Sequence, residues 1–327
     1  MTHLPQDSIL GRDGWKPGEL LWLALALGCY FVFPEYLSLG TSVLVMVLVV
    51  MSYDLLLGFA GVLSLGHAVF FGLGAFVAGW LSLVGWTEPI SVALIGGLAA
   101  AALAGLVGPF LLRLTGLPLL MVTLALGVLV FEGAHKATSI TGGDDGLSGI
   151  QFAPVLGLFE WKLGGATSYL YVLAWLVVLF VLLKRVVASP FGVVLQGIRE
   201  NPARMRLIGN SVLPHLTLVY AISAAVAGVA GALFTQANAF VGLGVLALDT
   251  SVDVLVMLVL GGIGGLHGAL IGAPLYMLLK HFSSQWNPYY WMLIVGALLI
   301  AVVMLGRGGA LGLLQRAMRR AVAGVKP

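Results

Sequence analysis

One stretch decides the fold: residues 37–80 read LSLGTSVLVMVLVVMSYDLLLGFAGVLSLGHAVFFGLGAFVAGW. Asp54 is the single Asp, Glu, Lys or Arg residue in it, and apolar side chains flank a glycine-rich centre. A helix needs about 20 consecutive apolar residues to cross a bilayer. The stretch therefore predicts two membrane segments, 37–57 and 68–84, with a helix interruption between them.

The whole chain shares this composition. Of its 327 residues, 60% are hydrophobic and 9% are charged, whereas soluble domains are about 45–50% apolar and about 25% charged. So few charges cannot cover a water-exposed surface, which excludes a soluble globular enzyme. Glycine contributes 45 residues, as is typical of transmembrane helices that pack closely or break within the bilayer. We expect an all-α polytopic membrane protein with about 8–10 transmembrane helices, some broken at glycine-rich segments.

Ten apolar segments can be drawn, and several are short enough to be half-helices. They cover residues 20–33, 37–57, 68–84, 90–112, 117–133, 168–187, 214–236, 252–263, 267–282 and 289–305. Eight complete spans with additional broken segments is the alternative.

The cations predict the orientation, because Lys and Arg concentrate in cytoplasmic segments. Ten of the sixteen lie in two groups, which are Lys184, Arg185, Arg199, Arg204 and Arg206 in a central polar segment, and Arg307, Arg316, Arg319, Arg320 and Lys326 at the C-terminus. Both groups should be cytoplasmic, and counting spans backwards places the N-terminus there too. The expected organisation is a cytoplasmic segment 1–19, a transmembrane domain 20–314 with an extracytoplasmic loop 135–165 and a cytoplasmic loop 188–213, and a basic tail 315–327. The first segment does not resemble a cleaved signal peptide.

The motifs of common enzymes are missing from the sequence. No lysine follows a glycine, which excludes the Walker A pattern, and neither HExxH nor G-x-S-x-G occurs. Cys29 is the single cysteine, and no His, Cys and carboxylate group has metal-ligand spacing. We expect no catalytic residues, no metal, no cofactor and no nucleic-acid partner for this chain.

Three acidic residues, Asp54, Glu132 and Asp253, fall within or beside the apolar segments. A carrier driven by an ion gradient keeps such groups inside its spans, because their burial is costly. Asp54 and Glu132 lie near expected span ends, and Asp253 opens an expected helix, where a carboxylate favours the positive dipole end. We expect interfacial anchoring for all three, and an ion-coupled carrier is the alternative.

Two glycine-rich stretches, 58–74 and 261–272, interrupt apolar runs without adding charge. A helix broken at membrane depth exposes backbone polar groups, which must line a cavity or be buried in protein. Close helix packing through small residues predicts the same composition, so both interpretations stay open. At His67 and His267, which lie in these stretches, we expect hydrogen bonds rather than proton relay. The candidate path residues are Gly61, Ser64, Gly66, His67, Gly72, Gly264, Gly265 and His267.

Two polar segments stand out between the apolar ones. In TGGDDGLSGI (residues 141–150), Gly142, Gly143 and Gly146 permit backbone conformations closed to other residues, and Asp144 and Asp145 can bond their own turn. These features predict an ordinary surface turn in the extracytoplasmic loop.

The cytoplasmic segment 189–214 predicts two short helices. Phe191, Val194, Leu195 and Ile198 follow helical spacing and form one apolar face. Asn201-Pro202 can start a second helix over 203–208, ended by Gly209-Asn210. Such an amphipathic element either lies on the membrane surface or packs into a groove on a partner.

Five motifs in order resemble the LivM-type permeases, the membrane subunits of bacterial ABC importers for branched-chain amino acids, with relatives that import urea or short amides. The motifs are GFAGVLSLGHAVFFGLGAF (58–76), TGGDDGLSGI (141–150), SPFGVVLQGIRENPARMRLIGNSV (189–212), ISAAVAGVAGAL (222–233) and LVLGGIGGLHGALIGA (258–273). The resemblance covers residues 37–314.

The resemblance implies a place in an importer of the bacterial cytoplasmic (inner) membrane. By this likeness the chain works beside a second, LivH-type permease, two ABC ATPase subunits that bind ATP and Mg, and an extracytoplasmic solute-binding protein. The docking residues for the ATPase would be Arg199, Glu200, Asn201, Arg204 and Gly209. Gly209 fits the general importer consensus, but Ala203 stands where that consensus has Glu. An ion-coupled secondary carrier and a membrane scaffold without a path are the rival interpretations.

Overall fold

The computed structural model describes residues 17–286 apart from 156, 158, 160 and 162–164, together with residues 293, 296, 297 and 300. Regular elements in this part of the chain are helices, joined by two isolated bridges, Leu147–Val241 and Val155–Phe159. The predicted all-α fold is confirmed. The basic tail 315–327, most of segment 1–19 and almost all of the expected span 289–305 lie outside the described residues.

The long helices match the expected segments within a few residues. They are α1 (Pro17–Val32), α2 (Leu37–Asp54), α3 (Ala68–Leu83), α4 (Pro89–Leu111), α5 (Leu117–Lys136), α7 (Ala166–Ala188), α10 (Val212–Asn238), α11 (Leu248–Gly261) and α12 (His267–Trp286). Shorter elements are η2 (Pro34–Tyr36), η3 (Leu55–Phe59), α6 (Thr138–Thr141), η4 (Gly143–Asp145), α8 (Pro190–Glu200), α9 (Pro202–Leu207) and η5 (Leu243–Leu246). Within the described ranges, five helical stretches are long and apolar enough to cross a membrane: Pro34–Phe59, α4, α5, α7 and α10.

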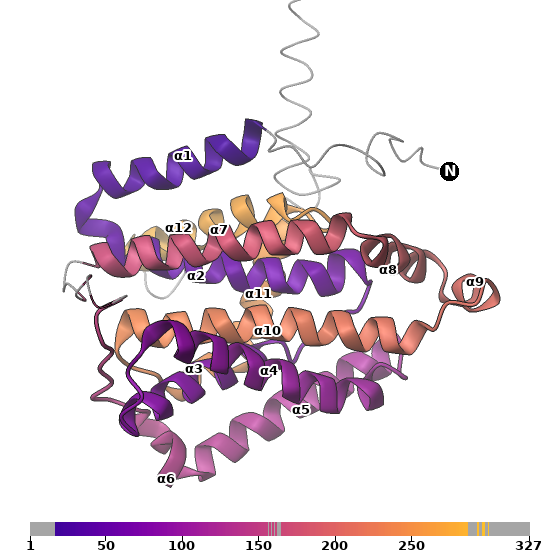
Figure 1. Ribbon diagram of the computed structural model, residues 1–327, viewed down its shortest axis with the longest axis horizontal. Helices are drawn as coiled ribbons and strands as arrows, with labels where there is room; N and C mark the ends of the chain where they lie inside the picture. Colours follow the sequence, from indigo (N-terminus) through magenta and orange to yellow (C-terminus); the bar gives the residue numbers. More distant parts are fainter. Residues whose placement is uncertain are drawn as a thin grey trace, which may run out of the picture.

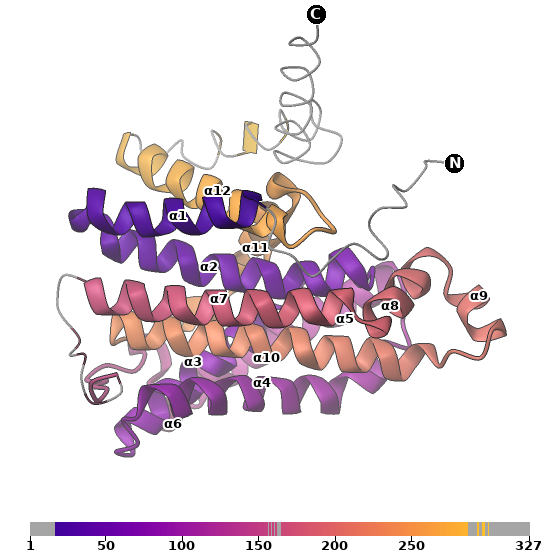
Figure 2. The ribbon, with the colours of Figure 1, turned by 45° about the horizontal axis from the view of Figure 1, so that its top comes forward.

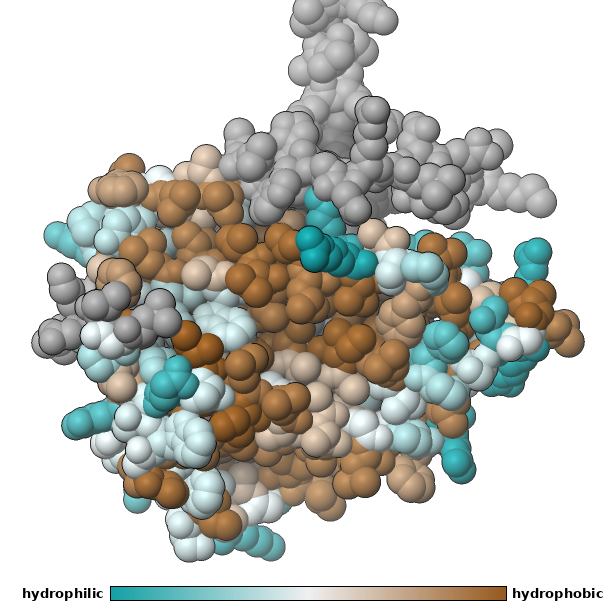
Figure 3. Space-filling model, viewed as in Figure 1, coloured by the Kyte–Doolittle hydropathy of each residue, from teal (hydrophilic) through white to brown (hydrophobic). Residues whose placement is uncertain are grey.

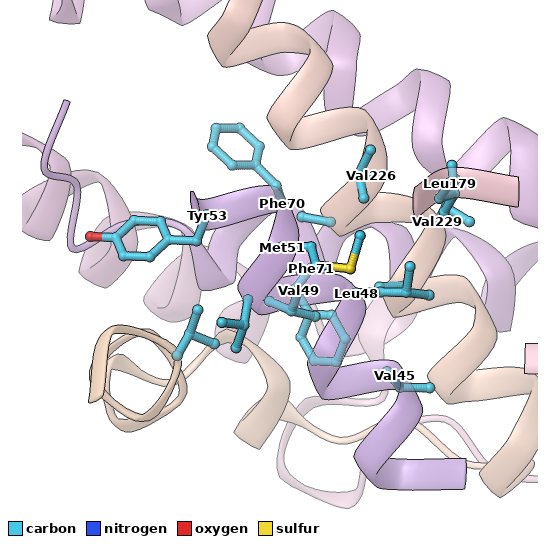
Figure 4. Packing of buried hydrophobic residues seen from close by; sticks show 14 of the residues in the cluster. Val45, Leu48, Val49, Met51, Tyr53, Phe70, Phe71, Leu179, Val226 and Val229 are labelled. Atoms are coloured by element: carbon cyan, nitrogen blue, oxygen red, sulfur yellow. The ribbon is translucent and has the colours of Figure 1, made fainter. Parts of the chain in front are cut away.

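Helix α2 is the centre of the bundle. It contacts α7, α10, α11 and α12, and it runs between α12 on one side and α7 and α10 on the other (Figure 2). Side chains such as Leu48 and Met51 of α2 pack toward α3, α7 and α10 (Figure 4). This central position explains why the opening stretch of sequence is apolar on all sides.

Glycines let α3, α4 and α10 approach one another closely. A Cβ on Gly74 of α3 would lie 2.0 Å from the Gly228 carbonyl oxygen of α10, and one on Gly231 would lie 1.9 Å from the Phe71 carbonyl oxygen of α3. Small residues at helix contacts permit such backbone approach in membrane bundles. Many of the glycines in this chain therefore serve helix packing.

The α4 helix begins with a well-defined cap. Glu88 accepts a hydrogen bond from the backbone N–H of Ser91 at 2.8 Å, and Pro89 occupies the first turn. The hydrogen bonds from Ser91 lower the pKa of the exposed Glu88 carboxyl below its usual value. A charged cap marks this helix end as one that lies in water or headgroups.

The outer surface is apolar in the middle and polar at its ends. Figure 3 shows hydrophobic residues over the centre of one face and hydrophilic residues toward both ends. Leu117, Met121 and Leu129 of α5 are among the exposed apolar residues. One end of the molecule carries α8 and α9 and the opposite end carries α6 (Figure 1); we call them the α8 end and the α6 end.

Candidate functional site

The first helix break covers residues 60–67, between η3 and α3. Its backbone polar groups are satisfied by side chains from other helices. The Tyr53 hydroxyl donates to the Ser64 carbonyl oxygen at 2.8 Å, and the Leu65 N–H donates to Thr123 Oγ1 at 3.2 Å. Ser251 Oγ accepts from the first N–H of α3, at Ala68, at 3.0 Å. The break is held by α2, α5 and α11 together.

His67 lies at the end of this break and is 1% exposed. Its Nε2 and Ser52 Oγ are 2.8 Å apart, and Ser52 Oγ also donates to the Val49 carbonyl oxygen. The predicted hydrogen-bonded histidine is therefore present. Its Nδ1 has no hydrogen-bond partner among the described residues. Ser64 and Gly66 are buried beside it.

The second break covers residues 262–266, between α11 and α12. Gly262 and Gly264 have φ values of 112° and 90°, a region that favours glycine because it has no Cβ. His267 begins α12, and its ring lies 6.0 Å from that of Phe180 on α7. At the turn, Gly264 is exposed and Gly265 is partly exposed.

The two breaks meet at one place, which we call the charged junction: Asp54, Gly58, Gly61, Arg199 and Gly264. The Asp54 carboxylate accepts a hydrogen bond from the Gly264 N–H at 2.8 Å. The Arg199 guanidinium, from α8, donates to the Gly58 carbonyl oxygen. A Cβ built on Gly61 would lie 2.8 Å from Arg199 Cγ. Arg199, an expected docking residue, thus lies together with Gly61 and Gly264, two of the expected path residues.

Two of the acidic residues differ from what the sequence predicts. Asp54 is fully buried, because α2 continues past it into η3 and the α11–α12 turn covers it; anchoring in water or headgroups is wrong for this residue. Asp253 does not open a helix, since α11 begins at Leu248. Asp253 instead accepts from the Tyr276 hydroxyl and pairs with Lys280 at 2.8 Å, which joins α11 to α12. Glu132 is exposed on α5.

Part of each glycine-rich stretch serves helix packing, one of the two interpretations that the sequence left open. The breaks are shorter than expected, because Gly72 and Gly74 lie within α3, and Gly268 and Gly272 within α12. These helical glycines meet neighbouring chain: a Cβ on Gly72 would lie 2.3 Å from Leu246 Cδ2, and one on Gly272 would lie 2.1 Å from the Met257 carbonyl oxygen. Gly72 is thus a packing residue against η5.

A pocket of about 230 Å³ opens beside the first break. Its volume is just below the range of about 300–1,000 Å³ typical of small-molecule sites. The lining is mostly apolar and comes from the start of α3, the middle of α5, η5 and the start of α11. It comprises Leu65, Ala68, Val69, Leu124, Gly127, Val128, Phe131, Leu246, Ala247, Leu248, Asp249 and Ser251.

The predicted pair of short helices is confirmed at the α8 end. Leu195 and Ile198 of α8 are buried, and α8 contacts α7, α10 and η3. Asn201 Oδ1 accepts from the Arg204 N–H at 3.0 Å and caps α9. Gly209, with φ of 86°, follows the end of α9. Arg199, Glu200, Asn201, Arg204 and Gly209 are all exposed here, and the guanidinium of Arg199 also reaches the charged junction.

The expected surface turn lies at the α6 end. Gly142, Gly143 and Gly146 have φ of 74°, 59° and 67°. A Cβ on Gly146 would lie 2.4 Å from the Val241 carbonyl oxygen, because residue 147 pairs with residue 241. Asp144 pairs with His135 at 2.9 Å, and both are exposed, as is Asp145.

The sequence interpretation missed several residues around the breaks. Ser52, Thr123 and Ser251 satisfy the first break from three different helices. Isolated hydroxyl residues in apolar helices are too common to single out without the tertiary contacts. Leu207 and Ile208, 88% and 65% exposed at the tip beyond α8, were also missed. The sequence did offer an indication of this exposed tip, because two neighbouring apolar residues follow Arg204 and Arg206 in a polar segment.

The described ranges contain no group of three or more His, Cys, Asp or Glu residues placed to hold a metal ion. The candidate site consists instead of two helix breaks, the pocket beside them and the helix pair that reaches the breaks through Arg199. Such an arrangement brings backbone groups and small side chains together where helices end inside the bundle.

Comparisons with known proteins agree with this arrangement. The family model described as the branched-chain amino acid transport system permease component matches residues 36–303. The high-affinity branched-chain amino acid transport system permease protein LivM of Escherichia coli (strain K12) is 29% identical over 92% of this chain and 76% of its own length. The LivM protein of Salmonella typhimurium (strain LT2) is 28% identical over the same shares. A probable LivM of Methanocaldococcus jannaschii is 28% identical over 34% of each chain. No solved structure matches.

Proposed function

The chain belongs to the permease-component family of branched-chain amino acid transport systems, and from this premise we propose that it is the membrane subunit of an ATP-driven importer of branched-chain amino acids. In this proposal the chain forms part of the translocation path. It has no ATPase site of its own, and partner subunits bind ATP and Mg and supply the energy.

The α8–α9 pair is the observation that carries the proposal. It stands outside the bundle of long helices (Figure 1) and exposes the apolar residues Leu207 and Ile208 beside Arg204 and Arg206. An exposed apolar tip fits a groove on a partner protein, and arginine is enriched at protein interfaces. We assign this surface to an ABC ATPase subunit.

The cations at the α8 end support an orientation in the membrane. Lys184, Arg185, Arg204 and Arg206 lie in or beside α8, α9 and the end of α7. Because short cytoplasmic segments are rich in Lys and Arg, the α8 end faces the cytoplasm of a bacterial cell and the membrane is its cytoplasmic (inner) membrane. The turn around Asp144 and Asp145 then faces outward, where an extracytoplasmic binding protein would deliver solute.

The two breaks and the adjoining pocket are the best candidates for the path. Half-helices that end inside a transporter place backbone groups along a solute route. The α3 start, with Leu65 and Ala68, lines the pocket, and exposed residues of α5 offer a surface for the second, LivH-type permease. Branched-chain amino acids are the proposed cargo because the family and the LivM relatives are named for them; urea or a short amide is the alternative.

A carrier driven by an ion gradient is the rival that one observation favours, since Asp54 is a buried carboxylate. However, Asp54 holds the turn at Gly264 and lies beside Arg199. The hydrogen bond from Gly264 gives one carboxylate oxygen a structural role, as expected for a group held in protein rather than one that exchanges with water.

The docking surface is testable with a pair of matched variants. We expect Leu207→Asp to abolish co-purification of the ATPase and ATP-dependent uptake, because it places a charge in an apolar interface. Ile140→Asp is the control, since Ile140 is 57% exposed in α6 at the opposite end. Normal assembly and uptake in Leu207→Asp would overturn the docking assignment.

The cargo is testable in the same assembly. Uptake of labelled leucine into proteoliposomes should be inhibited by unlabelled isoleucine and valine, and not by urea or acetamide. Inhibition by the amides alone would assign the cargo to the alternative class.

A further inference from the structure

Asp54 is a buried carboxylate with an incomplete set of partners. It is the last residue of α2 and is fully buried. Its Oδ1 accepts from the Gly264 N–H, and its Oδ2 has no hydrogen-bond partner among the described residues. A buried carboxylate is costly unless an opposite charge and hydrogen bonds compensate. The position therefore requires a nearby cation.

Arg199 supplies that cation from α8. Its guanidinium donates to the Gly58 carbonyl oxygen, one turn after Asp54, which places the positive charge near the Asp54 carboxylate. A Cβ on Gly264 would lie 3.4 Å from Arg199 Nη1 and 3.5 Å from the Gly58 carbonyl oxygen. The arginine side chain is thus packed against backbone from both breaks.

Glycines make room for this arrangement. A Cβ on Gly58 would lie 2.2 Å from Asp54 Oδ1 and 2.8 Å from the Gly264 nitrogen, which leaves no space for a side chain. Gly61 has φ of 72° and passes close to Arg199 Cγ. The segment 55–59 is a π-helix, a local distortion that is frequent at functional sites.

The junction connects the docking element to both breaks. Arg199 lies two residues before Asn201, which caps α9, so a movement of α9 and α8 moves the guanidinium. Gly58 lies in η3 just before the first break, Gly61 lies in that break, and Gly264 lies in the second. A shift of α8 by the 1–2 Å typical of helix shifts at interfaces would lengthen or break the hydrogen bond to Gly58.

We propose that Asp54 and Arg199 form a latch that transmits movement of the ATPase-docking helices to both glycine-rich breaks. Arg199 and Asp54 are positioning residues in this proposal, which rests on the proposed function. When the latch is closed, the turn at Gly264 and the chain at Gly58 are held together. When α8 moves, Arg199 leaves Gly58 and both breaks are free to rearrange.

The test compares Asp54→Asn, Arg199→Gln, Arg199→Lys and the Asp54→Asn/Arg199→Gln double variant in the assembled transporter. Arg185→Gln is the matched control, because it removes an exposed cation from the end of α7. Three quantities are measured: co-purification of the ATPase, ATP hydrolysis, and ATP-dependent uptake of labelled leucine.

A latch predicts uncoupling. Asp54→Asn and Arg199→Gln should keep assembly and ATP hydrolysis, while uptake per ATP falls at least about tenfold, the order expected for one lost hydrogen bond to a charged group. Arg199→Lys should retain part of the coupling, because it keeps the charge without the planar fork. The double variant should be no worse than the worse single variant, since coupled residues are not additive.

Three results would overturn the latch: unchanged uptake per ATP, equal loss of assembly and hydrolysis, or additive losses in the double variant. A wild-type assembly without ATP-dependent uptake would instead contradict the proposed function. If Asp54→Asn does not accumulate, amide hydrogen exchange in Arg199→Gln decides. Faster exchange at residues 262–266 supports the latch, and unchanged exchange overturns it.

Discussion

The close contact of α10 with α3 makes Gly231 the most demanding glycine of the bundle. A Cβ there would lie 1.9 Å from the Phe71 carbonyl oxygen and 2.8 Å from the Ala75 nitrogen, about 1.5 Å short of ordinary contact with the first atom. Both obstacles are backbone atoms, so no side chain can turn aside. Gly231→Ala therefore forces the two helices apart.

The expected size follows from two opposing effects. Overpacking costs about 1–3 kcal/mol, and the backbone obstacle places this site at the upper end. Alanine recovers roughly 0.8–1 kcal/mol through its higher helix propensity. The net loss should be about 2 kcal/mol, or a fall in melting temperature of roughly 4–8 °C by the scaling for domains of 150–250 residues.

The assay is thermal unfolding of the purified permease in detergent at one fixed heating rate. Gly105→Ala is the control, because Gly105 lies in α4 with no atom within 4 Å of its Cβ position; it should melt at or slightly above the wild-type temperature. Equal melting temperatures for Gly231→Ala and Gly105→Ala would refute the close α3–α10 contact.

Three further predictions address the polar contacts and the second break. Ser52→Ala should lower the free energy of unfolding by about 1–3 kcal/mol, because it leaves the buried His67 without its hydrogen-bond partner at 2.8 Å. The control is Ser42→Ala, which should have little effect because the Ser42 hydroxyl bonds the Ser38 carbonyl oxygen in the same helix. Equal melting temperatures of the two variants would contradict the reasoning. The Asp253–Lys280 pair should show a coupling energy below about 1 kcal/mol in a double-mutant cycle, since the side chains are 26% and 38% exposed; a coupling of several kcal/mol would show a buried pair. In a Cys29→Ser background, Gly265→Cys should react with a membrane-impermeant maleimide from the cytoplasmic side, because no atom lies within 4 Å of its Cβ position. Gly268→Cys should react less, because a Cβ on Gly268 would lie 2.1 Å from the Gly262 carbonyl oxygen. Equal labelling of Gly268→Cys would contradict the geometry of the second break.

The helices were largely predictable because apolar length and turn residues act locally. The expected segment 117–133 became α5 at Leu117–Lys136, and Asn201-Pro202 began α9 as expected. These features depend on the apolar residues of each segment and on its capping residues, both of which can be read from the sequence.

The junctions were not predictable, because they depend on contacts across the sequence. Asp54 and Gly264 are separated by 210 positions, and Arg199 and Gly58 by 141. Asp54 lies near an expected span end, so the sequence predicts an anchor at the membrane interface. In the structure, the turn between α11 and α12 buries it. Gly72 and Gly264 also have similar surroundings in sequence, and only tertiary packing separates a helical contact from a break.

Leucine accumulation in proteoliposomes that hold the complete assembly tests ATP-driven import most directly. With ionophores present to remove ion gradients, ATP on the ATPase side should drive accumulation of labelled leucine delivered by the binding protein. Accumulation that needs a proton or sodium gradient and proceeds without ATP would contradict import driven by ATP hydrolysis in the partner subunits.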